Sequence, residues 1–143
     1  MVKTVRFVLA SLLIWCVTLV SAGAECVRDP LPKTSNPVVI VSDVKSLVAA
    51  VARANKENNL TIALDDGVYE LKQPLYLRGN EITLRGLSGN RDQVVLRGQG
   101  MSGGLSHIFQ VVGSGITLAD LTAGWVTQHV AQVHAENDAD RFH

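Results

Sequence analysis

Short apolar runs separated by turn residues fill the chain after residue 59. One phrase occurs twice, as Ile82-Thr83-Leu84 and Ile116-Thr117-Leu118, and each copy is followed by a further leucine, Leu87 or Leu121. A weaker copy, Thr61-Ile62-Ala63-Leu64, begins 21 residues before Ile82, so Thr61 would correspond to Ile82. A period of tens of residues indicates stacked repeats, none of which can bury its own apolar face. We therefore expect about three short strands per repeat, without a helix, as in a β-solenoid.

Further strand-like segments lie between and beyond these copies, at residues 69–71, 75–77, 94–96, 108–112 and 130–133. Turns rich in Gly, Asn and Asp separate them. A parallel β-helix and an antiparallel barrel or sandwich both fit strands of this length. Repeat matching favours the parallel β-helix, because the two isoleucine-leucine phrases, with Leu87 and Leu121, stack inward only if successive coils run parallel. Residues 98–107 are expected to form a loop.

An amphipathic helix is predicted at residues 42–58, before the first repeat. Ser42 is a candidate N-cap, and Asp43 would lie in the first turn, where a carboxylate interacts favourably with the helix dipole. The i, i+3, i+4, i+7 spacing of apolar residues places on one helical face Val44, Leu47, Val48, Val51 and Ala54. Such a helix would cover the unpaired edge and the apolar cross-section where a solenoid starts.

Residues 1–24 have the features of a secretory signal. Lys3 and Arg6 precede an apolar core at residues 7–20, and Ala22-Gly23-Ala24 offers a cleavage site. This core is shorter than the roughly 20 residues of a membrane-spanning helix, and an uncleaved anchor is the alternative. We expect a secreted or periplasmic protein without membrane contact after cleavage. Residues 25–41 contain three of the four prolines and are expected to form an extended leader.

The charge and cysteine content of the mature chain limit the classes of partner that it is expected to bind. Loss of the signal would reduce the 13 Lys and Arg to 11, against 13 Asp and Glu. A nearly neutral domain has no electrostatic footprint for nucleic acid or an anionic membrane. Cys16 would leave with the signal, so Cys26 would remain as a free thiol or pair with a partner outside this sequence.

Only about three coils fit into residues 60–143, and terminal repeats normally need caps. No polar capping helix follows the last strand-like run. We therefore expect the amino-terminal piece of a longer protein, or a truncated reading frame. Its open cross-section, at Ile116, Leu118, Leu121 and residues 130–133, would promote self-association because unpaired strand edges recruit other chains.

Two segments carry a resemblance to a known family. They are Ser42-Asp43-Val44-Lys45-Ser46-Leu47, continued by Ala54-Asn55, and Thr61-Ile62-Ala63-Leu64-Asp65-Asp66-Gly67-Val68-Tyr69. This run resembles the opening of right-handed parallel β-helix proteins of the pectate-lyase-like superfamily, over roughly residues 38–136. The resemblance implies an all-β, right-handed parallel β-helix whose first coils occupy residues 60–143, with an amino-terminal capping helix.

The same resemblance implies an exported protein that acts on or binds an acidic polysaccharide, as a lyase catalysing β-elimination on uronic-acid polymers would. The superfamily also contains hydrolases, epimerases and non-catalytic members, so a carbohydrate-binding or surface-adhesion solenoid is the alternative. Many of its lyases carry Pro-Gly-Asp where this chain has Asn58-Asn59-Leu60. This departure argues against any particular lyase family, and the sequence assigns no catalytic residue.

Three Leu-Arg-Gly phrases supply Arg78, Arg85 and Arg97 as candidate substrate-binding residues. Arginine can hold a sugar carboxylate through two parallel hydrogen bonds. However, the strand assignment puts these arginines on three different faces of the coil. We therefore favour solvent-facing arginines beside acidic neighbours over a single binding patch.

Other candidate chemistry lies in the last third of the chain. Residues 98–103 match the dinucleotide-binding glycine pattern but lead into a strand, where that site requires a helix. His129 and His134 have odd spacing and would point to opposite faces of a strand, so they could not share a metal there. Three carboxylates could supply oxygen ligands for Ca²⁺, or simply form a solvated turn: Glu136, Asp138 and Asp140. The resemblance implies that Ca²⁺ would suit a lyase; no other cofactor is indicated.

Overall fold

The computed structural model describes residues 35–137 and 139–143. In this part of the chain, ten short strands and a single α-helix are present, and every strand pairing is parallel. The antiparallel barrel or sandwich is thereby excluded. No helix within these residues has the length and apolar character that a membrane span requires. The expected signal, Cys26 and the first part of the leader lie outside the described residues.

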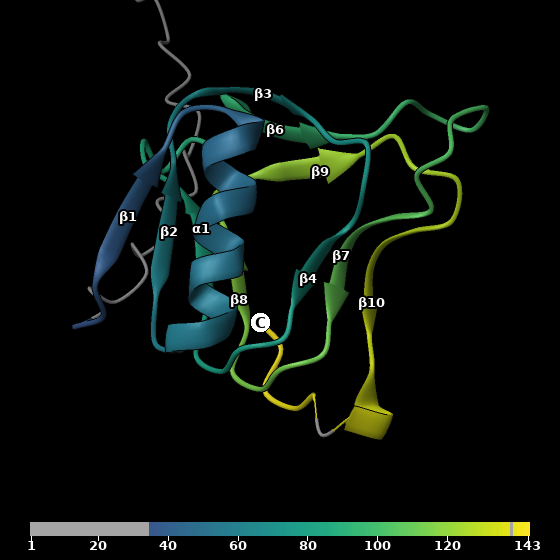
Figure 1. The fold of residues 1–143 in the computed structure, drawn as a ribbon. Coiled ribbons are helices and arrows are strands. Elements are labelled where there is room, and N and C mark those ends of the chain that lie inside the picture. The colour runs from purple at the N-terminus through teal and green to yellow at the C-terminus, as the bar shows by residue number, and fades with distance from the viewer. Residues whose placement is uncertain (1–34, 138) are drawn as a thin grey trace, which may run out of the picture.

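The strands form three parallel sheets (Figure 1). Sheet A contains β1 (Val38–Val41), β2 (Thr61–Leu64), β5 (Thr83–Gly86) and β8 (Thr117–Ala119). Sheet B contains β3 (Gly67–Glu70), β6 (Val94–Arg97) and β9 (Thr122–Gly124). Sheet C contains β4 (Leu75–Leu77), β7 (His107–Val111) and β10 (His129–Val133). Each coil adds one strand to each sheet, so that β2–β4, β5–β7 and β8–β10 are successive coils. This arrangement fits a β-solenoid.

The register of sheet A confirms the main repeat and corrects the weak copy. Thr83 lies opposite Thr117, as the repeat predicted. Thr61 lies opposite Thr83, so its expected match with Ile82 was wrong by one position. A slip of one residue would turn every side chain of the strand to the other face. In the observed register Ile62 points into the core and is fully buried.

The predicted stacking of isoleucines is confirmed. Ile82 and Ile116 precede paired residues of β5 and β8, and both are fully buried. Leu84 is also fully buried. Leu87 was expected to point inward, and that expectation was wrong: this side chain is 49% exposed. Strand β5 ends at Gly86, so Leu87 lies in the following turn, where strand alternation no longer applies.

Helix α1 (Val44–Glu57) begins later than expected, because Asp43 rather than Ser42 is the N-cap. The Asp43 carboxylate accepts a hydrogen bond from the Ser46 backbone N–H at 2.7 Å. In return, the Asp43 backbone N–H donates to Ser46 Oγ at 3.2 Å. This reciprocal capping box satisfies two backbone donors at the helix start. The first turn accordingly contains no acidic residue.

One face of α1 joins the core. In Figure 1 the helix lies between the strands of sheet A and β4. Its buried residues are Leu47, Ala50, Val51 and Ala54. Val48 was expected to be buried, and this was wrong: it is 51% exposed because it lines a groove at the edge of that face. Lys45 and Arg53 lie on the other side of the helix and are exposed.

The last residues of the chain run alongside β8. The His143 backbone N–H donates to the Ile116 carbonyl oxygen at 2.9 Å, and the Leu118 backbone N–H donates to the His143 carbonyl oxygen at 2.8 Å. This alternation is the ladder of a parallel strand pair. The cross-section that was expected to be open is therefore partly covered in sheet A. In sheet C, Val130 and Val133 are each 39% exposed.

Candidate functional site on sheet C

The three Leu-Arg-Gly arginines belong to three different sheets, as predicted. Arg85 in β5 of sheet A forms an ion pair with Asp120 at 2.8 Å. Arg97 in β6 of sheet B forms an ion pair with Glu70 of the preceding coil. Each of these two arginines therefore has a carboxylate partner within the molecule. They do not form a common binding patch.

Arg78 follows β4 of sheet C and differs from the other two arginines. It makes no ion pair with any residue that the structure describes. Its guanidinium carbon lies 4.9 Å from the centroid of the Tyr76 ring, which is a cation–π contact. The tyrosine is 43% exposed. Sheet C thus presents an aromatic ring and an uncompensated cation together at the surface.

A row of polar side chains runs across sheet C from Tyr76; Tyr76 and Gln132 are exposed, whereas Gln110 between them is only 8% exposed. The register places Tyr76 opposite Gln110, and Gln110 opposite Gln132. The flanking Leu75 and Leu77 are buried in the core, so alternation directs Tyr76 outward. Gln110 Nε2 donates to Gln132 Oε1 at 3.4 Å. We call Tyr76, Gln110 and Gln132 the sheet C row.

His134 extends this row beyond the end of β10. Its Nε2 lies 2.5 Å from Gln110 Oε1, and its Nδ1 lies 2.8 Å from Glu136 Oε1. The hydrogen bond from His134 lowers the pKa of the Glu136 carboxyl below its usual value. With an oxygen atom at each ring nitrogen, the imidazole is held in one orientation beside the row.

A groove of about 460 Å³ lies between α1 and the segment that leads into β4. This volume falls within the roughly 300–1,000 Å³ typical of small-molecule sites. Its walls combine apolar and polar side chains, including Val44, Val48, Asn55, Lys72, Pro74 and Tyr76. Tyr76 belongs to both the groove and the sheet C row. We call this feature the α1–β4 groove.

Asn55 fixes the helix side of the groove to β4. Its Nδ2 donates to the Tyr76 carbonyl oxygen at 2.7 Å. Its Oδ1 accepts hydrogen bonds from the backbone N–H groups of Arg78 at 2.8 Å and Gly79 at 3.1 Å. The backbone on the carboxyl side of the exposed Tyr76 ring is therefore anchored, which favours a groove that is formed before any ligand arrives.

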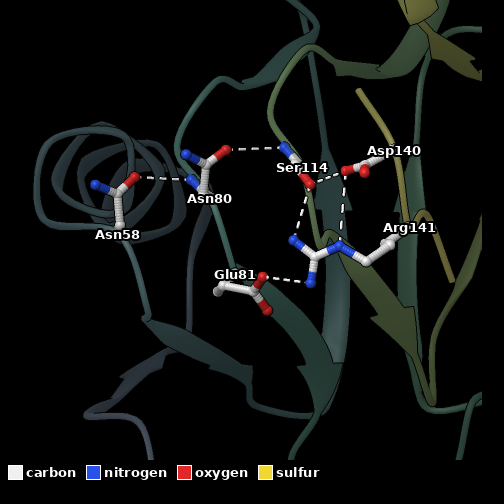
Figure 2. A network of polar contacts seen from close by, with 6 residues as sticks. All are labelled: Asn58, Asn80, Glu81, Ser114, Asp140 and Arg141. Carbon is white, nitrogen blue, oxygen red and sulfur yellow. Dashed lines mark hydrogen bonds and ion pairs between the residues drawn. The ribbon is translucent and has the colours of Figure 1, made fainter. Parts of the chain in front are cut away.

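A ladder of polar side chains joins the coils at the turn into sheet A (Figure 2). Asn58 Oδ1 accepts from the Asn80 backbone N–H at 2.7 Å, and Asn80 Oδ1 accepts from the Ser114 backbone N–H at 2.9 Å. The Ser114 hydroxyl donates to the Asp140 carboxylate. At the first two steps, a side chain satisfies a backbone donor of the next coil at a corner where the ladders of the sheets stop. This network stabilises the fold.

The residue after each ladder position has a left-handed backbone conformation. The φ angles are 47° at Asn59, 55° at Glu81, 67° at Gly115 and 49° at Arg141. Such angles are uncommon outside glycine, so their recurrence shows that the same corner is built four times. Arg141 also pairs with Glu81 at 2.7 Å and donates to Ser114 Oγ at 3.0 Å. The chain at Asp140 and Arg141 thus forms the same kind of corner that precedes β2, β5 and β8 of sheet A.

The calcium candidates take part in separate networks. Glu136 contacts His134, whereas Asp140 accepts from Ser114 in the ladder. Asp138 lies outside the described residues. Among those described, no group of three or more His, Cys, Asp or Glu side chains could hold a metal ion. Glu136 and Asp140 do not form a calcium shell, and a site that includes Asp138 stays a prediction. Residues 98–103 lead into β7 without a helix, as predicted.

The sequence analysis missed the sheet C row. The signal that could have revealed it is a triplet of apolar, polar and apolar residues in the third strand of each coil. These triplets are Leu75-Tyr76-Leu77, Phe109-Gln110-Val111 and Ala131-Gln132-Val133. Their middle residues differ in type, so only the register makes them neighbours.

Three parallel sheets of short strands, with one helix packed against the first coil, are consistent with a parallel β-solenoid. No protein-family model, curated protein or solved structure matches this chain. Membership of the pectate-lyase-like superfamily therefore rests on the sequence resemblance alone and stays a prediction.

Proposed function

We propose that the chain is an exported, right-handed parallel β-helix that binds an acidic polysaccharide along the α1–β4 groove and the sheet C row. Right-handedness is supported by the strong preference of parallel strand crossovers for that hand. The burial of one face of α1 against the first coil supports its role as the amino-terminal cap. Export is supported by the composition of residues 1–24.

The observation that carries this proposal is the pairing of Arg78 with Tyr76 beside the groove. An exposed aromatic ring offers an apolar face on which a sugar ring can stack. A guanidinium without an acidic partner can hold a uronate carboxylate through two hydrogen bonds. Lys72, which also lines the groove, makes no ion pair within the described residues and adds a second cation.

The direction of the row suits an extended polymer. Its members come from three successive coils, which are about 4.8 Å apart along the stack. The exposed amide group of Gln132 can exchange hydrogen bonds with sugar hydroxyl groups, whereas the buried Gln110 positions Gln132 and His134 through its own hydrogen bonds. A polysaccharide lying along the stack would meet the aromatic ring first and then this series of polar groups.

Polysaccharide cleavage by β-elimination is the second candidate function. In that reaction a base removes the proton from C5 of a uronate, a double bond forms between C4 and C5, and the glycosidic oxygen leaves from C4. The observation in favour is the position of His134 at the end of the row; to act as the base, its ring would first release one of its two contacts, with Gln110 or with Glu136. The superfamily resemblance supports the same reaction class.

Titration calorimetry of the full chain with oligosaccharides of alginate, pectate and chondroitin tests the proposal, with a neutral glucan as control. We expect Arg78→Gln and Tyr76→Ala each to weaken binding by roughly tenfold or more, because a charge-assisted hydrogen bond or a stacked ring contributes about 1.5 kcal/mol or more. Arg85→Gln is the matched control, since it changes the same Leu-Arg-Gly phrase on sheet A, and neither Arg85 nor its partner Asp120 lines the groove.

Absence of binding, or equal weakening by Arg85→Gln, would contradict the proposal. Ultraviolet absorbance of unsaturated sugar products separates the two candidate functions. Binding without product formation supports a binding module. Product formation that is lost in His134→Ala while binding persists supports the lyase reaction.

A further inference from the structure

Two histidines face each other across sheet C, at the opposite end of β7 and β10 from His134. His107 and His129 are register partners in these parallel strands, so their side chains project from the same face of the sheet. The ring centroids are 5.8 Å apart and the ring planes are inclined by 41°. The sequence analysis considered His129 only with His134, because His107 belongs to the preceding coil and is distant along the chain.

This separation is within reach of a shared metal ion. Imidazole nitrogen binds Zn²⁺ at about 2.0–2.1 Å, so two rings on one ion have centroids roughly 5–6 Å apart. Rotation about the side-chain bonds of the exposed His129 can bring its ring nitrogen toward that of His107. The strand backbones already provide the spacing, and no rearrangement of the sheet is needed.

The neighbouring residues fix the orientation of the His107 ring, whereas the His129 ring is accessible to solvent. His107 is only 6% exposed, and its Nδ1 lies 2.8 Å from Ser106 Oγ. A hydrogen bond at one ring nitrogen fixes the orientation of a ligating histidine and directs its other nitrogen to the ion. His129 is exposed, and its ring makes no hydrogen bond with any residue that the structure describes. Solvent can therefore deliver the ion and complete its coordination.

We propose that His107 and His129 form a two-imidazole binding site for a divalent transition-metal ion, Zn²⁺ or Cu²⁺, with water as the remaining ligands. Zn²⁺ and Cu²⁺ bind well to imidazole nitrogen, whereas Ca²⁺ and Mg²⁺ prefer oxygen ligands. The site is therefore distinct from the calcium hypothesis based on Glu136, Asp138 and Asp140. It bridges the second and third coils and does not depend on the proposed polysaccharide binding.

Titration calorimetry of the full chain with Zn²⁺, in a preparation without a polyhistidine tag, tests this site. We expect one ion per chain, no binding of Ca²⁺ at the same concentration, and at least a tenfold loss of affinity in His129→Ala. His134→Ala is the matched control at the other end of the same sheet and should retain full affinity, because its ring is held by Gln110 and Glu136.

A spectroscopic measurement on the unmodified chain keeps the proposal testable if a variant fails to fold. In nuclear magnetic resonance spectra, Zn²⁺ should shift the imidazole signals of His107 and His129 together, at the same ion concentration. The proposal is overturned if no Zn²⁺ binds, if His129→Ala binds as tightly as the unmodified chain, or if only the signals of His134 or His143 shift.

Discussion

The two leucines of the repeated phrase allow a direct test of the coil register. Leu84 lies opposite Leu118 in β8 and opposite Ile62 in β2, and it is fully buried. Leu87, in the turn that follows the strand, is 49% exposed. We expect Leu84→Ala to destabilise the fold strongly and Leu87→Ala to have little effect, although the two changes remove the same atoms from the same sequence motif.

The expected loss of unfolding free energy follows from how each leucine is packed. Replacing Leu84 by alanine removes three carbon groups from the core, at about 0.8 kcal/mol each. The cavity left between neighbouring coils adds to this, for a total of about 2.7–5 kcal/mol. A surface change such as Leu87→Ala should stay within about 0.5 kcal/mol.

Urea unfolding of the full chain, followed by circular dichroism, measures both values. For an m-value of about 2 kcal/mol per molar, Leu84→Ala should lower the midpoint by roughly 1.3–2.5 M without changing m. Equal midpoint shifts for the two variants would refute the register, because both leucines would then have to be equally buried.

Three further predictions concern the helix and the turns. Leu47→Asp should cost at least about 3 kcal/mol because it places an unpaired charge in the core, whereas Val48→Asp on the groove side should cost about 0.5 kcal/mol; similar melting of both would contradict the packing of α1. Asn80→Ala should cost about 1 kcal/mol by removing the acceptor of the ladder, and Asn80→Asp, which keeps an acceptor oxygen, should cost less in the same unfolding assay. The hydrogen bonds from Ser46 lower the pKa of Asp43 below its usual 3.8, so its contribution to stability is present above pH 3.8 and is lost as the pH falls through the lowered value. Asp43→Asn keeps a capping oxygen and should flatten this part of the acid-unfolding profile, and an unchanged profile would exclude the role of the carboxylate.

Much of the fold is predictable from the sequence because the core positions are apolar and repeat. Ile82 and Ile116 identify the stacked strands of sheet A, and their parallel arrangement is confirmed. The errors occur where periodicity ends. Leu87 follows the last residue of β5, and Asp43 takes the N-cap position that Ser42 could also have filled. At such boundaries, local hydrogen bonds decide between residues that the pattern treats as equivalent.

The site is far less predictable than the fold. The ladder positions are occupied by Asn58, Asn80, Ser114 and Asp140, at unequal spacing along the chain. Each of these residue types carries a side-chain oxygen that can form a hydrogen bond at a turn. The ladder requires such an oxygen but not one particular residue type, so no repeated residue marks these positions in the sequence. Function at the outer face of a coil likewise depends on which side chains the register brings together, and loops of different length hide that register in the sequence.

The distribution of charge partners among the three sheets is the strongest support for the proposed binding site on sheet C. Arg85 and Arg97 each pair with a carboxylate, one on sheet A and the other on sheet B, whereas the Arg78 guanidinium on sheet C lies over an aromatic ring. Stability in a stacked repeat depends on the contacts between neighbouring coils. A polymer that contacts Tyr76 and Gln132 would span three coils, so its binding should also strengthen their stacking, since a ligand that prefers the folded chain stabilises it. A metal ion on His107 and His129 would join only the second and third coils. The two ligands should therefore protect different backbone amides from hydrogen exchange, and this difference separates the polysaccharide proposal from the metal proposal without any change to the sequence.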